Sequence, residues 1–258
     1  MLKKIFLILV AMMICGCSSQ EQTQPTKVGA LTQLNSTPED NLNFYENFNS
    51  MQMALSSKNI TAVQTYSSVA QYMTKNNADF VINDAQTVQI VDNFCFAMRE
   101  GESDLRSDFD TAINGMKADG TLDKFISIYI NNPDEPIKSV EIPTIDGAET
   151  IRVAVTGDLP PLDFVNADGK PAGFNTAVLS EISKRIGKNV EIIQVDSSAR
   201  GAALTSGQVD VIFWVVVPAE ENSNRPKDFD TPEGVVVTVP YYQDRVTNVT
   251  LAGIAAAF

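Results

Sequence analysis

The strongest constraint on the fold of this 258-residue chain is an alternation of apolar runs and helical stripes between residues 151 and 217. Three apolar runs predict strands, at 151–155, 190–195 and 209–217. The segments between them predict helices, over about 175–186 and 199–206. The last run is almost continuously apolar, as expected for a strand covered on both faces. Strands that alternate with helices predict a parallel, right-handed βαβαβ sheet in an α/β protein.

The loops that follow these strands are poor in catalytic groups. Small ligands bind beyond the carboxyl ends of strands in such sheets, here at 157–159, 196–198 and 214–218. The chain contains no histidine, so only Asp158, Asp163 or Asp196 would serve as a general acid or base. Each of these also suits a turn or a helix cap. We therefore expect a binding protein rather than an enzyme, with no catalytic residue, cofactor or metal.

Four short motifs follow one another in the second half of the chain, at 158–164, 168–175, 204–211 and 240–242. They read Asp-Leu-Pro-Pro-Leu-Asp-Phe, Asp-Gly-Lys-Pro-Ala-Gly-Phe-Asn, Leu-Thr-Ser-Gly-Gln-Val-Asp-Val and Pro-Tyr-Tyr. Together they resemble the first lobe of bacterial extracellular solute-binding proteins of the amino-acid type, which have the type II periplasmic-binding-protein fold. The resemblance implies two lobes that close on a small molecule and deliver it to the permease of an ABC-type importer.

The segments stand in a rotated order compared with that family. Four ranges correspond to lobe two, to the closing strand and helices, to a linker and to lobe one: 27–91, 92–130, 131–149 and 150–258. The final residues, 246–258, resemble the strand that crosses into lobe two. We therefore predict a circularly permuted monomer with a shortened lobe two, since permutation is tolerated where termini lie close together. The alternative is a fusion of two incomplete copies that exchanges a strand with a second chain.

In the lobe-two segment, apolar residues predict an amphipathic helix near residues 48–55. Met51 and Met53 are both expected in its core-facing stripe rather than in a cofactor site. A second helical stripe, from Leu105 to Met116, is expected in the closing segment.

The first residues predict export to the cell surface or periplasm. An apolar run at 5–13 follows two lysines and is too short to span a membrane as a folded helix. Residues 14–17, Ile-Cys-Gly-Cys, resemble a bacterial lipoprotein cleavage box. This implies a signal peptide at 1–16, lipidation of Cys17 and a flexible tether at 17–26 that anchors the protein to the bacterial membrane. An ordinary secretory signal cut elsewhere is the alternative.

Charge and cysteine content limit the partners. The formal net charge of −13 argues against a nucleic-acid partner, because phosphate binding needs a basic surface. If Cys17 is acylated, Cys95 is left without a disulfide partner. Cys95 stands in an apolar run and is predicted to be a buried, unreactive thiol.

The resemblance also implies ligand positions. In that family, Ser or Thr of lobe two and an Arg of lobe one hold the ligand carboxylate, and an Asp of lobe two holds the ammonium. Ser36 and Thr37 match the hydroxyl pair, although a purely structural helix cap is the alternative. Tyr66 occupies the position of the Asp.

In lobe one the family positions are occupied by other residue types, namely Leu159, Ser197, Trp214, Val215 and Asn222. Arg225 replaces the family Arg only if its loop bulges, and a plain loop role is the alternative. Asp158 and Arg200 are further candidates for ligand contact at predicted strand ends, with a surface role as the alternative for Arg200. Trp214 either lines the cleft or belongs to the core.

An ordinary α-amino acid would leave unpaired buried charges in such a site, so tight binding of one is not expected. Trp214 and Tyr66 instead offer two aromatic faces for a less charged ligand. The sequence thus predicts a solute-binding lipoprotein for an amino-acid-like or related metabolite. The alternative is a sensor or interaction lipoprotein whose degenerate cleft no longer binds amino acids.

Overall fold

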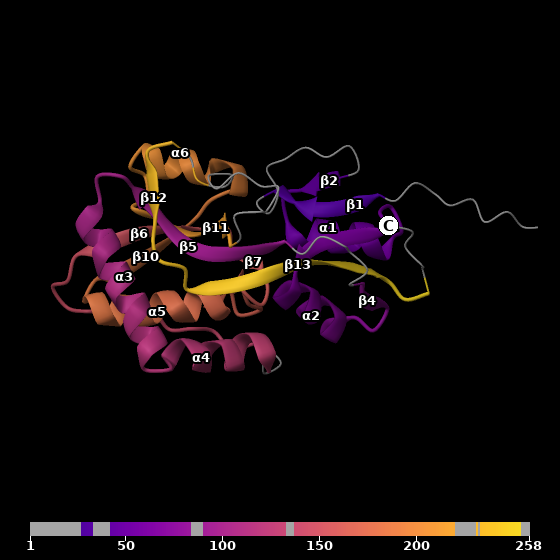
Figure 1. Cartoon of the computed structure of the whole chain (residues 1–258), viewed down its shortest axis with the longest axis horizontal. Coiled ribbons are helices and arrows are strands. Elements are labelled where there is room, and N and C mark those ends of the chain that lie inside the picture. Colours follow the sequence, from indigo (N-terminus) through magenta and orange to yellow (C-terminus); the bar gives the residue numbers. More distant parts are fainter. Residues whose placement is uncertain are drawn as a thin grey trace, which may run out of the picture.

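The computed structural model describes residues 27–32, 42–83, 90–132, 137–219, 231 and 233–253 (Figure 1). The predicted signal peptide and tether, with Cys17, lie outside these ranges, as do Ser36, Thr37, Asn222 and Arg225. Within the described ranges, no helix combines the length and the apolar character that a membrane crossing needs.

Lobe one, as we call it, is built on three parallel strands in the order β10-β6-β11, which β5 and β12 extend in the antiparallel sense. Its main strands are β5 (Val91–Arg99), β6 (Thr150–Val155), β10 (Asn189–Gln194), β11 (Val211–Pro218) and β12 (Val235–Val237). A separate small sheet comprises β7 (Asp158–Leu159), β8 (Asp163–Val165) and β9 (Pro171–Ala172). Its helices are α3 (Ser103–Ala118), α4 (Thr121–Phe125), η2 (Ile126–Asn131), α5 (Phe174–Ile186), η3 (Ser197–Ala199) and α6 (Arg200–Thr205).

The apolar run of β11 is covered on both faces, as the sequence predicts. Phe213 and Trp214 belong to the main core, whereas Ile212 and Val215 pack in a second cluster with Leu204 of α6. The register of β11 against β5 shifts between Ile212 and Val215. Such a bulge breaks the simple alternation of faces, which is why two consecutive aromatic residues enter one core. Helices α3, α4 and α5 lie on one side of this sheet and α6 on the other (Figure 1).

Lobe two repeats the strand order of lobe one on a smaller scale. Its parallel strands run in the order β2-β1-β3. The elements are β1 (Val28–Leu31), β2 (Leu42–Tyr45), α1 (Phe48–Ser56), β3 (Ala62–Tyr66), α2 (Ser67–Asn76) and β4 (Phe80–Asn83). Met51 is fully buried in α1, but Met53 is 70% exposed, so the prediction that Met53 belongs to the core is wrong. Residues two positions apart in an α-helix are separated by about 200° around the helix axis, so the side chains of Met51 and Met53 lie on opposite faces.

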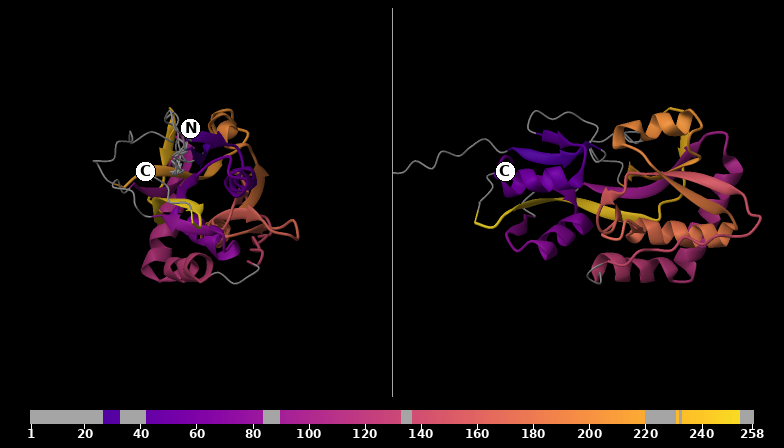
Figure 2. Two further views of the ribbon diagram at one scale, coloured as in Figure 1. Left: turned by 90° about the vertical axis from the view of Figure 1, so that its right-hand side faces the viewer. Right: turned by 180° about the vertical axis from the view of Figure 1, so that it is seen from behind.

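One long strand, β13 (Tyr242–Leu251), belongs to both lobes. Residues 242–245 pair with β5, whereas residues 246–251 pair with β3 and β4. The strand path is therefore continuous from one lobe to the other, and β5 and β13 run side by side where they leave lobe one (Figures 1 and 2). Residues 246–251, within the range 150–258 assigned to lobe one, thus pair in the lobe-two sheet, in the segment that is expected to cross into lobe two.

Several motif residues have structural roles in lobe one. Asp210 accepts hydrogen bonds from Arg152 Nη2 at 2.8 Å and from Arg99 Nη2 at 3.2 Å, which ties β6, β5 and the start of β11 together. Gly173 has a φ of 105°, and a side chain there would collide with the carbonyl oxygens of Pro161 and Leu162. Glycine is therefore required where the chain enters α5.

The predicted linker, 131–149, packs against lobe one in its described part. Ile137 is buried, and Ser139 forms a bridge with Ala172. Ser180 Oγ donates to the Glu141 carbonyl at 2.7 Å. The segment has little regular structure, as its composition indicates, but its backbone polar groups are partly satisfied by α5.

Candidate functional site

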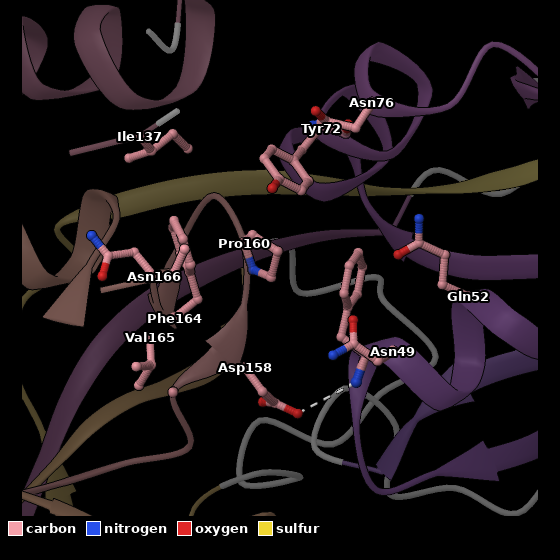
Figure 3. Close-up of a pocket in the computed structure, with 13 residues that line it drawn as sticks. Asn49, Gln52, Tyr72, Asn76, Ile137, Asp158, Pro160, Phe164, Val165 and Asn166 are labelled. Carbon is pink, nitrogen blue, oxygen red and sulfur yellow. Dashed lines mark hydrogen bonds between the residues drawn. The ribbon is translucent and has the colours of Figure 1, made fainter. Parts of the chain in front are cut away.

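Three cavities lie between the lobes in the described part of the chain, and two of them share Asp158. The first has a volume of about 470 Å³, and its walls come from α1 and α2 on one side and from residues 157–167 on the other (Figure 3). The second has a volume of about 780 Å³, and is lined from lobe two by Glu46 and Asn47 and from lobe one by the β6, β10 and α6 regions. The third, of about 520 Å³, lies between α2, which contributes Tyr72 and Lys75, and residues 130–132 with Pro161. Volumes of this order suit small metabolites.

Asp158 links the two lobes. It follows β6 after Thr156 and Gly157 and is the first residue of β7, so it lies beyond the carboxyl end of a parallel strand. Asp158 Oδ2 accepts a hydrogen bond from the Phe48 N–H of α1 at 3.3 Å, the contact drawn dashed in Figure 3. The same helix end is capped by Asn47 Oδ1, which accepts from the Ser50 N–H at 2.9 Å. An anionic group is favourable at this position because the first N–H groups of a helix lack intrahelical acceptors.

Asp158 is half-buried, and this burial raises the pKa of its carboxyl group, while the Phe48 N–H acts in the opposite direction. Among the described residues, no lysine or arginine forms an ion pair with Asp158. The shared wall of the two cavities therefore carries a partly desolvated acid that has no cationic partner within the part of the chain that the structure describes.

A buried polar network positions the loop that carries Asp158. Asp163 Oδ2 accepts from the Gly157 N–H at 3.1 Å, and Asp163 Oδ1 accepts from Trp214 Nε1 at 2.9 Å. Tyr241 Oη extends this network by donating to Asn175 Oδ1 at 3.0 Å. Burial raises the pKa of Asp163 to about 6, and the hydrogen bonds from the Gly157 N–H and the Trp214 indole oppose the shift.

Several residues that the sequence predicted to contact a ligand lie in the core rather than in the cleft. Trp214 and Val215 are each 1% exposed, and Leu159 is fully buried. Arg200 is also buried, because its Nη1 donates to the Trp214 carbonyl at 2.7 Å and its guanidinium lies 5.3 Å from the Trp214 ring centroid. The prediction that Trp214 lines the cleft is therefore wrong, and so is the surface role considered for Arg200.

Tyr66 likewise points into the interior. It is 1% exposed, its hydroxyl donates to Asp92 Oδ2 at 2.6 Å, and its ring packs edge-on against Phe94 at 4.9 Å. The cleft position inferred for Tyr66 is therefore wrong, because this side chain turns toward the strands that join the lobes. Of the candidate ligand residues that the structure describes, Asp158 and Ser197 line a cavity, and both border the second one.

No sequence pattern predicted the lobe-two wall of the first cavity. Asn49 and Gln52 of α1 and Tyr72 and Asn76 of α2 point toward the opening (Figure 3). They stand at i, i+3 and i, i+4 spacing on the polar sides of amphipathic helices. That pattern is the same for a cleft wall and for a solvated face, so the sequence held no signal that separates them. No cluster of metal-ligating side chains occurs among the described residues.

Comparisons with known proteins concern mainly lobe one. Residues 151–239 match the family described as "Bacterial extracellular solute-binding proteins, family 3". An 83-residue segment is 29% identical to the L-cystine-binding protein TcyJ of Escherichia coli K12, covering 32% of this chain and 31% of that protein. A 98-residue segment is 29% identical to a probable amino-acid ABC transporter-binding protein of Haemophilus influenzae, covering 36% and 38%. The chain thus spans about a third of the length of these curated relatives, both of which are named as binding proteins.

Among solved structures, the GluR0 ligand-binding core in complex with L-glutamate aligns over 91% of this chain and 87% of that chain. The TM-score is 0.44 and the sequence identity is 8%.

Proposed function

We propose that this protein captures a small polar solute between its lobes and delivers it to an ABC-type importer at the bacterial membrane. The observation that carries the proposal is the pair of interlobe cavities at the carboxyl ends of β6 and β10. The family match over 151–239 supports it, because that segment supplies the lobe-one wall of both cavities. The solute is an amino-acid-like or related metabolite, and lipidation of Cys17 holds the protein at the membrane surface.

The mechanism we propose is closure of lobe two onto lobe one. Only β5 and β13 run between the lobes among the described strands, and β13 changes partners between Arg245 and Val246. A ligand that contacts both lobes favours the closed state by its additional contacts. The hydrogen bond between Asp158 and the Phe48 N–H already spans this gap.

Circular permutation remains part of the proposal, and the strand pairing supports it. Ala62 of β3 pairs with Val28 on one side and with Thr250 on the other. The start of β1 and the end of β13 are thus separated by about 10 Å, two strand spacings. Joining two such points needs only a short connection, which is the geometry that makes permutation inexpensive.

A second candidate function is a sensor or interaction lipoprotein with a degenerate cleft. The burial of Tyr66 and Trp214 favours it, because neither ring is available to stack on a ligand. In this case the cavities would be remnants of an ancestral site.

A thermal-shift screen with amino acids, amines, sugars and short peptides tests the proposal. At least one solute is expected to raise the melting temperature, since ligand binding to the native state stabilises it. Val165 lines the first cavity and is 50% exposed, whereas Val81 on β4 is 40% exposed and borders neither cavity. Val165→Trp should abolish the shift of a first-cavity ligand and Val81→Trp should preserve it. Absence of any stabilising solute would contradict the transport function and favour the sensor.

A further inference from the structure

We infer that the interlobe cleft selects a solute that carries an amine cation, with the Asp158 carboxylate as its counter-ion, and that a ligand carboxylate is not required. The inference rests on the proposed function and specifies its ligand. Every charged residue among the described residues that line the two cavities is an acid, namely Glu46, Asp158 or Asp196. Asp158 borders both cavities, so it meets a ligand in either.

The hydrogen bonding of Asp158 leaves room for a ligand. The Phe48 N–H donates to Oδ2 at 3.3 Å, and the Thr156 hydroxyl and the Asp158 N–H also donate to this carboxylate, which has about four acceptor positions in all. Half-burial removes part of the water that would fill the remainder. A partly desolvated carboxylate is stabilised most by a cation that also donates hydrogen bonds. A protonated amine supplies both.

The other walls of the first cavity also suit an amine. Tyr72 and Phe164 present aromatic rings to it, and an ammonium group is attracted to the face of such a ring (Figure 3). The amide side chains of Asn49, Gln52 and Asn76 add carbonyl oxygens that accept N–H groups. These groups come from both lobes, so closure would surround the amine on several sides.

A ligand carboxylate meets the opposite conditions. Asp158 would repel it at short range in a partly dry site, where such repulsion is weakly screened. Among the described residues that line these two cavities there is no lysine or arginine to offset that repulsion; Lys75 lines the third cavity, which shares Tyr72 with the first. An amino acid would therefore bind through its amine and leave its carboxylate toward solvent.

Isothermal titration calorimetry with three probes of equal chain length tests the inference: cadaverine, 5-aminopentanoate and glutarate. The affinity should fall in that order, with no detectable binding of glutarate. Asp158→Asn preserves the shape of the side chain but removes its charge, and it should weaken cadaverine binding about tenfold or more. Asp146→Asn changes an exposed acid of the 131–149 linker, outside both cavities, and should leave the affinity unchanged. Melting curves of both variants establish that they are folded.

The outcomes separate the two proposals. Glutarate binding as tight as cadaverine binding, or full cadaverine affinity in Asp158→Asn, would overturn the amine inference. The same holds if cadaverine fails to bind while a solute without an amine stabilises the protein in the thermal-shift screen, and in that case solute capture still stands. If no solute of the screen binds, both proposals fall.

Discussion

The two lobes share one strand order but differ in how much of each sheet is buried in a core. In lobe one, β10-β6-β11 is followed by antiparallel β5, and in lobe two, β2-β1-β3 is followed by antiparallel β13. The first six residues of β11 are buried on both faces, whereas the two middle residues of β2 are exposed. The same topology therefore supports a two-sided core in one lobe and a thin one in the other.

Connection length accounts for part of this difference. The segment between β6 and β10, residues 156–188, contains α5, in which nine residues are buried. Residues 32–41 alone separate β1 from β2. Lobe two also depends on β13, from the far end of the chain, for its antiparallel strand. We conclude that lobe one is the stable base of the molecule and that lobe two is the part suited to movement.

The largest expected effect is a loss of stability when a buried phenylalanine of lobe one is replaced, compared with the same change in lobe two. Phe96 of lobe one is fully buried against the rings of Phe109 at 5.2 Å and Tyr241 at 4.8 Å. Phe96→Ala should lower the free energy of unfolding by about 3–5 kcal/mol. Phe80 of β4 is 3% exposed, but β4 pairs only with β13 among the described strands, so its surroundings can collapse more easily and Phe80→Ala should cost less. Urea unfolding measures both, and a reversed ranking would break the contrast between the lobes.

A pH series sharpens the description of the lobe-one core. The pKa of Asp163 is raised by burial from 3.8 to about 6, so the folded protein binds this proton more tightly than the unfolded chain does. The resulting stability is fully present below about pH 4 and is lost as the pH rises through about 6, a change of up to about 3 kcal/mol. Urea unfolding across that range should show the decline in the wild type and a flatter profile in Asp163→Asn. Parallel profiles would contradict the assignment.

The smallest effect is an expected gain in lobe two. Asn248 of β13 is fully buried, and neither polar atom of its side chain has a hydrogen-bond partner among the described residues. Asn248→Val removes these atoms and suits a strand, so it should raise stability by roughly 1–2 kcal/mol. Gln243→Val changes an exposed position of the same strand and controls for strand propensity. A loss of stability in Asn248→Val would show that the polar side chain of Asn248 makes favourable contacts in lobe two.

Local patterns were sufficient for much of lobe one. The strands β6, β10 and β11 and the helices α3 and α5 fall within a few residues of their predicted positions. Gly120, with a φ of 79°, ends one helix region and begins the next, as its neighbours indicate. Cys95 is buried in β5, and this burial raises its pKa to about 12. These features depend on spacing within one element, which a sequence displays directly.

The direction of side chains across elements was decided only by tertiary structure. The bulge in β11 directs Trp214 toward Asp163, and Tyr66 donates a hydrogen bond to Asp92 on a strand that joins the lobes. Neither ring therefore lines the cleft. The polar faces of α1 and α2 became a cavity wall because another lobe stands opposite them. The sequence by itself determined which elements form, since periodicity records burial along one chain segment. Which of their polar residues meet a ligand depends on partners distant in the chain, and no local pattern contains that information.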